Sequence, residues 1–248
     1  MKKLFICALL PVFCTLMTTI SFTACGGSDD ETDYAATAAM QEALNSEVNN
    51  DIPTAPETEK AGEAIDLGLP SGLKWASCNV GATDPEEYGS RYAWGEITEW
   101  TYTFGMPTGW SVYKWCNGTP NSLTKYCTDS SYGTVDGKST LEPADDAARI
   151  EWGGNWRTPT SAEFGELMNN CTWESNKTNS SIKITGPNGN HIVLPSGSYW
   201  TASKFNGWGC DHAYYFDLYR DKWTGEIQTK RIADSDRCDP MAIRPVRK

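Results

Sequence analysis

Histidine is scarce in this 248-residue chain, which has only His191 and His212, and several familiar catalytic patterns are absent. No Gly-x-Ser-x-Gly motif marks a hydrolase nucleophile. None of the nine cysteines lies in a Cys-x-x-Cys or Cys/His pattern with the spacing of a structural zinc site. A pair of catalytic carboxylates of the glycosidase kind is not excluded, because the distance between two such carboxylates depends on the fold and not on their sequence spacing. We therefore expect no catalytic residues, no cofactor and no metal site.

Positive charge is also in short supply. The chain has 21 Lys and Arg residues against 32 Asp and Glu residues, which gives a formal net charge of −11. Nucleic acids and anionic lipid surfaces attract proteins through basic patches. The charge balance therefore argues against a nucleic-acid partner and against electrostatic docking on a membrane.

The chain has no apolar run long enough to be a comfortable transmembrane helix, and its longest one has the features of an export signal. The charged start Met1-Lys2-Lys3 precedes LFICALLPVFCTLMTTISF, which ends in the small-residue sequence FTAC. This end resembles a bacterial lipobox, which implies a signal peptide at 1–24 and acylation of Cys25. The acidic run at 29–31 resembles the signal that sends lipoproteins of Bacteroidota-type bacteria to the cell surface. The alternative is an ordinary secretory peptide with an incidental cysteine.

Cysteine usage agrees with export. Cys7 and Cys14 lie in the predicted signal peptide and Cys25 would be acylated, which leaves six cysteines in the mature chain. An even number of cysteines in an exported chain permits disulfides, but sequence alone leaves their connectivity open.

Residues 25–62 are predicted to be a tether. They lack tryptophan, and NNDIPTAPETEKAG has the composition of a flexible linker. The stretch YAATAAMQEALNSEV could form a helix, so a partly helical tether that docks a partner chain is the alternative. All eleven tryptophans follow Lys74, and residues 63–248 have the length of one domain.

Local patterns in 63–248 predict short strands, few helices and long loops, which is an α+β fold. Thr160 and Glu163 have the spacing of a capping box, and the helix expected over 160–171 carries an apolar stripe of Phe164, Leu167, Met168 and Cys171. Residues 97–148 should be mostly irregular, with Cys116 and Cys127 as a candidate cross-link. Strands are expected near 64–68, 73–77, 182–186, 191–195, 198–203, 212–219, 223–228 and 241–247.

Six segments occur in a fixed order: AIDLGLPSGLKWASCNVGA, EEYGSRYAWGE, DDAARIEWGGNWRTPTSAEFGEL, SYWTAS, AYYFDL and IRPVR. Together they resemble the extracellular domains of the Fibrobacter-type major paralogous family and the related DUF1566 family, within the wider C-type-lectin-like group. The resemblance covers residues 63–248. It implies a C-type-lectin-like domain whose first and last strands pair, and in which WRTPT leads into a helix packed on the central sheet. Trp156 and Phe164 would then be core residues.

The same resemblance implies a structural disulfide between Cys210 and Cys238. The chain departs from two functional classes of that group. The Glu-Pro-Asn or Gln-Pro-Asp triplet of calcium-dependent lectins is absent, and no carboxylate cluster has a calcium-ligand spacing. The formylglycine-generating oxidases need a pair of reactive cysteines, and no second cysteine lies near Cys238 in sequence.

Aromatic residues late in the chain are the best candidates for ligand contacts. In the strand over 212–219, alternation places Tyr214 with two expected core residues, and Tyr215 with Asp217 and Tyr219 on a face that could be exposed. Flat aromatic rings beside Arg and Asp suit sugar rings or a protein hot spot. The candidate ligand-binding residues, expected to gather on the same loops, are Trp208, Asp211, His212, Tyr219, Arg220 and Trp223. Alternatively, Trp208 and Trp223 only fill the underside of long loops.

The sequence thus predicts an outer-membrane lipoprotein exposed at the cell surface, with a lipid anchor at Cys25 and a non-catalytic domain that binds an extracellular glycan or protein. The alternative is a structural or accessory subunit of a cell-surface assembly. An enzyme ranks third.

Overall fold

The computed structural model describes residues 62–101, 103–104, 108–176, 178–221 and 223–248. They belong to one compact unit that spans residues 56–248. The predicted signal peptide at 1–24, the lipidation site Cys25 and the tether at 25–62, apart from Gly62, lie outside the described residues. Within the described ranges, no helix has both the length and the apolar character needed to cross a bilayer.

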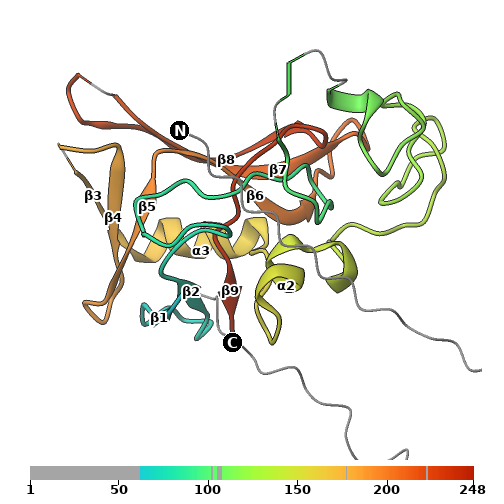
Figure 1. The fold of residues 1–248 in the computed structure, drawn as a ribbon. Coiled ribbons are helices and arrows are strands. Elements are labelled where there is room, and N and C mark those ends of the chain that lie inside the picture. Colours follow the sequence, from blue (N-terminus) through green and yellow to red (C-terminus); the bar gives the residue numbers. More distant parts are fainter. Residues whose placement is uncertain (1–61, 102, 105–107, 177, 222) are drawn as a thin grey trace, which may run out of the picture. The chain divides into compact units, whose positions relative to one another are not determined.

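Three small antiparallel sheets make up most of the regular structure, with two α-helices and two 3-10 turns among the described residues (Figure 1). This confirms the coarse prediction of short antiparallel strands, few helices and long loops. The first sheet contains β1 (Ala64–Asp66), β2 (Lys74–Ala76) and β9 (Val246–Arg247). The second contains β3 (Thr172–Ser175), β4 (Ser181–Thr185) and β5 (His191–Pro195). The third contains β6 (Gly197–Lys204), β7 (His212–Arg220) and β8 (Ile227–Asp236).

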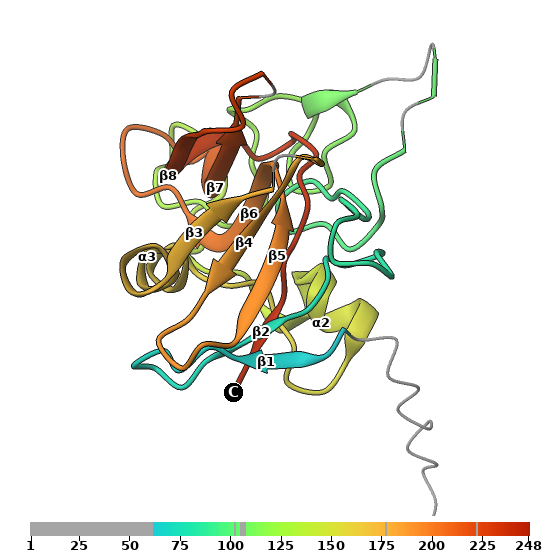
Figure 2. The ribbon, with the colours of Figure 1, turned by 90° about the vertical axis from the view of Figure 1, so that its left-hand side faces the viewer.

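The first and last strands meet in one sheet, as expected. β2 pairs with β1 across a turn closed by Gly72 N–H on the Leu69 carbonyl, and it pairs with β9 on its other edge. Figure 2 shows β1 and β2 beside the C-terminal end. The hairpin of β4 and β5 also forms where predicted, around residues 186–190. Residues 223–226, by contrast, are not strand: β8 starts only at Ile227.

Helix α3 (Ser161–Asn170) begins at the predicted capping box. The Thr160 side chain accepts from the Glu163 N–H, and the Glu163 carboxylate accepts from the Thr160 N–H. Phe164 and Leu167 are fully buried, and the Phe164 ring stacks on Phe216 of β7 with centroids 4.6 Å apart. The helix therefore covers the β6–β7–β8 sheet with its apolar stripe, and both Phe164 and Trp156 are core residues, as expected.

β7 is covered on both of its faces. Phe216 and Leu218 belong to the core under α3, and Ala213 belongs to a second core formed largely by Trp94, Tyr126 and Trp200. Tyr215, expected on an exposed face, is half-buried against this second core, so that expectation is wrong for this residue. The reason is its cross-strand neighbour: Trp200 of β6 lies opposite Tyr215, and its buried ring packs edge-on against the Tyr215 ring.

The prediction of mostly irregular structure over 97–148 is confirmed for the described residues of 97–146, whereas residues 147–148 are helical. Residues 97–146 contain the 3-10 turns η1 (Gly109–Ser111) and η2 (Pro143–Asp145) and lead into α2 (Ala147–Trp152). A third small core holds this segment together, with Tyr113, Leu123, Cys127, Cys210 and Cys238 buried in it. Because Cys210 precedes β7 and Cys238 follows β8, this core joins the irregular segment to the end of the β6–β7–β8 sheet (Figure 1).

Candidate functional site

The structure divides the six predicted ligand residues between the two ends of β7. Trp208, Asp211 and His212 lie where the strand begins, whereas Tyr219, Arg220 and Trp223 lie at the β7–β8 hairpin tip. A nine-residue strand is roughly 26 Å long, at about 3.3 Å per residue. In Figure 1 the hairpin tip lies at the upper left, and the start of β7 reaches the irregular segment at the right. The six residues therefore form two separate surfaces, not one.

The surface at the start of β7 is built around Trp208. Its side chain is 72% exposed, and its ring meets the His212 ring edge-on with centroids 4.9 Å apart. The Phe205 ring also meets the Trp208 ring, with centroids 5.9 Å apart, and it packs in turn on Tyr214. The Tyr214 hydroxyl donates to the Asn206 side chain. Trp208 is thus an exposed ring held in place by two aromatic neighbours, and it does not fill the underside of a loop.

A cavity of about 370 Å³ opens beside Trp208. Its lining joins the irregular segment to the β6–β7 loop and consists of Thr128, Asp129, Ser139, Lys204, Asn206, Gly207, Trp208, Gly209 and Cys210. The Asp129 carboxylate accepts from the N–H and hydroxyl of Ser131, and these hydrogen bonds lower its pKa. The cavity therefore offers a fixed negative oxygen, amide and hydroxyl groups, and an aromatic wall.

A charged cluster lies directly behind Trp208. His212 Nδ1 is 2.8 Å from an Asp234 oxygen, and its Nε2 is 3.0 Å from an Asp236 oxygen. Asp211, His212 and Asp236 each offer one ligand atom, and these atoms lie within 4.8 Å of one another. This donor set has the composition of a transition-metal or zinc site, and a carboxylate on the far ring nitrogen orients histidine ligands in such sites. Sequence analysis missed Asp234 and Asp236. Pairing the two strands of the β7–β8 hairpin would have revealed them, because its register places Asp236 opposite His212.

The surface at the hairpin tip differs in character. Tyr219 is 49% and Trp223 84% exposed, whereas Arg220 is only 8% exposed. The Arg220 side chain is turned inward, so it is not available beside the two rings. None of these three residues lines the cavity beside Trp208.

All six cysteines of the described part are free thiols in the structure. Cys210 and Cys238 are therefore not joined, although both lie in the same small core. The Cys210 sulfur instead accepts from the Thr128 N–H at 3.2 Å, which places it next to Cys127. The pKa of Cys127 is raised, first by burial and also by its hydrogen bond with Cys210. The neighbour of Cys210 is thus Cys127.

Comparisons with protein-family models, with curated proteins and with solved structures gave no match to this chain.

Proposed function

We propose that this chain is a surface lipoprotein whose C-type-lectin-like domain binds a glycan, without catalysis, at the surface formed by Trp208 and the adjoining cavity. The observation that carries the proposal is an exposed Trp208 ring fixed against His212 and Phe205 at the rim of a cavity lined by polar groups. The lipid anchor at Cys25 and the tether would present this domain outside the cell.

The chemistry of the rim suits a sugar. A pyranose ring stacks its C–H face on a flat aromatic side chain, which buries a large area with little loss of side-chain freedom. Hydroxyl groups of the sugar can then bond to fixed acceptors and donors in the cavity, such as Asp129 and Asn206. The Lys204 ammonium group donates one hydrogen bond to the Phe205 carbonyl at 2.7 Å, and its positive charge offsets the negative charge of Asp129 in the cavity lining. The site therefore favours a neutral sugar, recognised by stacking and by carboxylate and amide contacts.

The hairpin tip favours the second candidate, a contact with a partner chain in a cell-surface assembly. Tyr219 and Trp223 are exposed aromatic residues at the tip of a hairpin, and exposed aromatic residues are common in protein hot spots. The two candidates use different ends of β7, so they can be separated by mutation.

A glycan-array screen of residues 26–248 tests the proposal, with Trp208→Ala and Trp223→Ala as a matched pair of exposed tryptophans. We expect binding to fall at least tenfold in Trp208→Ala, about 1.4 kcal/mol, and to be unchanged in Trp223→Ala. Equal losses in both variants, or an array silent for a folded protein, would reject the glycan site. Self-association lost only in Trp223→Ala would favour the assembly role.

A chelator arm of the same screen shows whether the charged cluster takes part. Binding that survives chelation is carried by the aromatic rim alone. Binding that needs added zinc or calcium would assign a metal to Asp211, His212 and Asp236.

A further inference from the structure

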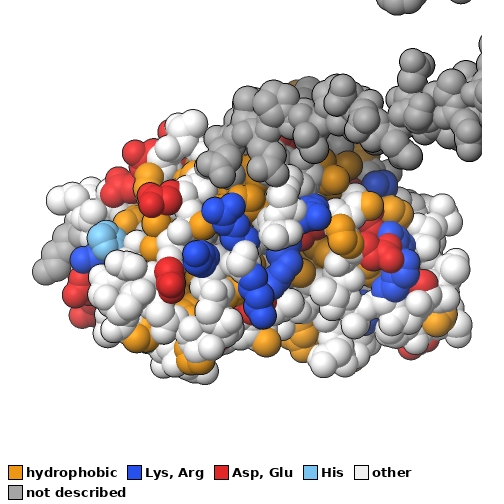
Figure 3. Space-filling view, turned by 90° about the horizontal axis from the view of Figure 1, so that it is seen from below, with side chains coloured by type: hydrophobic (Ala, Val, Ile, Leu, Met, Phe, Trp, Pro, Cys, Tyr) orange, Lys and Arg blue, Asp and Glu red, His pale blue; other side chains and the backbone are white. Residues whose placement is uncertain are grey.

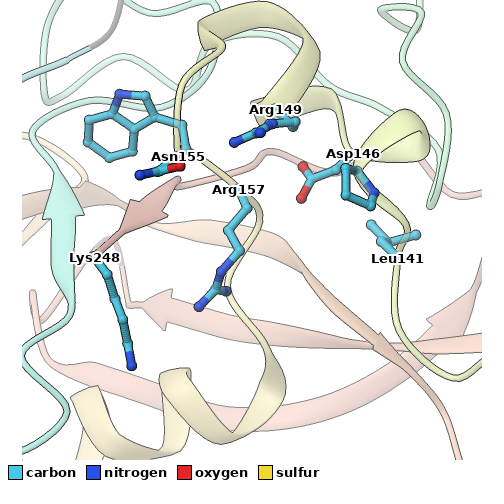
Figure 4. A pocket seen from close by; sticks show the side chains of 8 residues that line it. Leu141, Asp146, Arg149, Asn155, Arg157 and Lys248 are labelled. Carbon is cyan, nitrogen blue, oxygen red and sulfur yellow. The ribbon is translucent and has the colours of Figure 1, made fainter.

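A second cavity, of about 360 Å³, lies on a different part of the surface from Trp208. Its walls come from the end of the irregular segment, from α2 and the residues after it, and from the C-terminal residue (Figure 4). The lining residues are Leu141, Pro143, Asp146, Arg149, Asn155, Trp156, Arg157 and Lys248. Three of these eight are basic, in a chain with a formal net charge of −11.

Two of the charged groups in this cavity are already compensated. The Arg157 guanidinium donates two hydrogen bonds to the Glu163 carboxylate. The Asp146 carboxylate accepts from the N–H and hydroxyl of Thr158 and from the Ala148 N–H, which fixes it as the cap of α2. Neither group is therefore left to bind a counter-charge on its own.

The remaining polar side chains have no such partners. Among the described residues, the side chains of Arg149, Asn155 and Lys248 make no hydrogen bond or ion pair. Arg149 is half-buried, whereas Asn155 and Lys248 are exposed. Arg247 adds a further positive charge nearby, because its guanidinium lies over the Trp156 ring at 4.7 Å. Lys and Arg side chains also gather on the face shown in Figure 3.

We propose that this cavity binds a monosaccharide-sized organic anion, a sugar acid or a sugar phosphate, through Arg149 and Lys248. A guanidinium group holds a carboxylate or phosphate in a bidentate manner, and the ammonium group adds a point charge. Asn155 supplies an amide for a ring hydroxyl, and Leu141 with Pro143 forms an apolar wall against the ring. A volume of about 360 Å³ lies at the lower end of the range for small-molecule sites. This site shares no residue with the Trp208 surface.

The test is a calorimetric or NMR titration of residues 26–248 with glucuronate, glucose 6-phosphate, inorganic phosphate and neutral glucose. We expect glucuronate or glucose 6-phosphate to bind at least tenfold more tightly than glucose, with weaker binding at higher salt. Whichever of glucuronate and glucose 6-phosphate binds more tightly shows whether the site prefers a carboxylate or a phosphate. If inorganic phosphate binds as tightly as glucuronate or glucose 6-phosphate, the sugar ring contributes nothing to binding and the proposal is overturned.

Variants then locate the binding. Arg149→Gln/Lys248→Gln should weaken it at least tenfold, and the control Lys183→Gln, an exposed lysine on β4, should not. Trp208→Ala should leave it intact, which separates this site from the proposed glycan surface. Absence of binding by the wild-type protein, or equal binding by the double variant with a wild-type circular dichroism spectrum, would overturn the proposal.

Discussion

Two fully buried arginines hold two very different regions of this domain. Arg244 lies among regular elements: it donates to the carbonyls of Ala76 in β2 and Val193 in β5, and to the Asn79 side chain at 2.7 Å. Arg237 lies under the irregular segment and donates to the carbonyls of Lys125, Tyr126 and Cys210, and to the Tyr113 hydroxyl. Neither makes an ion pair with a carboxylate among the described residues.

The difference lies in what else holds each region. Around Arg244, strand register and an apolar core of Leu, Ile and aromatic side chains already fix the backbone. The irregular segment beside Arg237 has only isolated bridges, such as that of Cys116 with Leu123, and the guanidinium also lies against the rings of Trp94 and Tyr113, 5.0 and 5.4 Å from their centroids. A planar group with five donors can satisfy several loop carbonyls at once, as a strand neighbour would. Arg237 therefore adds cross-links between distant carbonyls to a segment that otherwise has a small core and scattered backbone hydrogen bonds.

The largest effect is expected for Arg244→Met. Burial lowers the pKa of Arg244 to about 10, which still leaves it charged at neutral pH. Its removal leaves several buried carbonyl acceptors without a donor, and each unsatisfied acceptor costs about 1–3 kcal/mol. We therefore expect the free energy of unfolding to fall by about 3–5 kcal/mol. Urea unfolding measures this, with Arg231→Met on β8 as the control, since its side chain is 65% exposed. A loss no larger than that of the control would contradict the role given to Arg244.

Arg237→Met should lower the free energy of opening the irregular segment by about 3 kcal/mol, and the rest of the domain should keep its stability. Hydrogen exchange should accelerate at the amides of Leu123, Thr134 and Asp136, which bond within the irregular segment. The amides of α3 and of the β4–β5 hairpin should keep their protection. Uniform acceleration across the domain would show that the two regions unfold together, and the contrast between the two arginines would disappear.

Sequence reasoning succeeded where structure is set by a few neighbouring residues. Thr160 and Glu163 lie three positions apart, and each can satisfy the other's backbone N–H whatever surrounds them. The turns at 70–72 and 186–190 likewise depend on local backbone preferences. Arg237 meets Tyr126 across 111 positions, and no local pattern encodes that contact.

The candidate site shows the same limit. Trp208 and Trp223 are close in sequence, but an extended strand of nine residues lies between them and carries them far apart. Alternation correctly predicted that Phe216 and Leu218 are buried, yet it could not predict the second core around Trp200 that also covers Tyr215. The basic cavity was missed because Arg149 and Lys248 are brought together only by the fold.

Oxidation of Cys127 and Cys210 should stabilise the irregular segment further. Their thiols are neighbours. Burial alone would raise the pKa of Cys210, but hydrogen bonds with Thr128 and Cys127, together with the charge of Lys204, lower it. In a glutathione redox buffer we expect a Cys127–Cys210 disulfide to form and to raise the free energy of unfolding by about 2–4 kcal/mol. The Cys127→Ser variant should show no such gain. Peptide mapping by mass spectrometry checks the pairing. A Cys210–Cys238 linkage would instead support the pairing implied by the family resemblance.

The smallest effect concerns the acid stability of the regular region. Burial alone would raise the pKa of Glu163, but hydrogen bonds from Arg157 and from the Thr160 N–H outweigh it and hold the pKa below its usual range. A lowered folded-state pKa gives stability that is fully present above the unfolded value of about 4.5 and is lost as the pH falls through the folded value.

Glu163→Gln should therefore be less stable than wild type at pH 7, and the gap should close as the pH falls below about 4.5. Thermal unfolding between pH 7 and pH 3 measures it. Asp146 acts in the opposite sense, because burial raises its pKa and protonation then favours the folded state. A gap between Glu163→Gln and wild type that stays constant with pH would mean that the Glu163 carboxylate supports α3 by packing, and not by its charge.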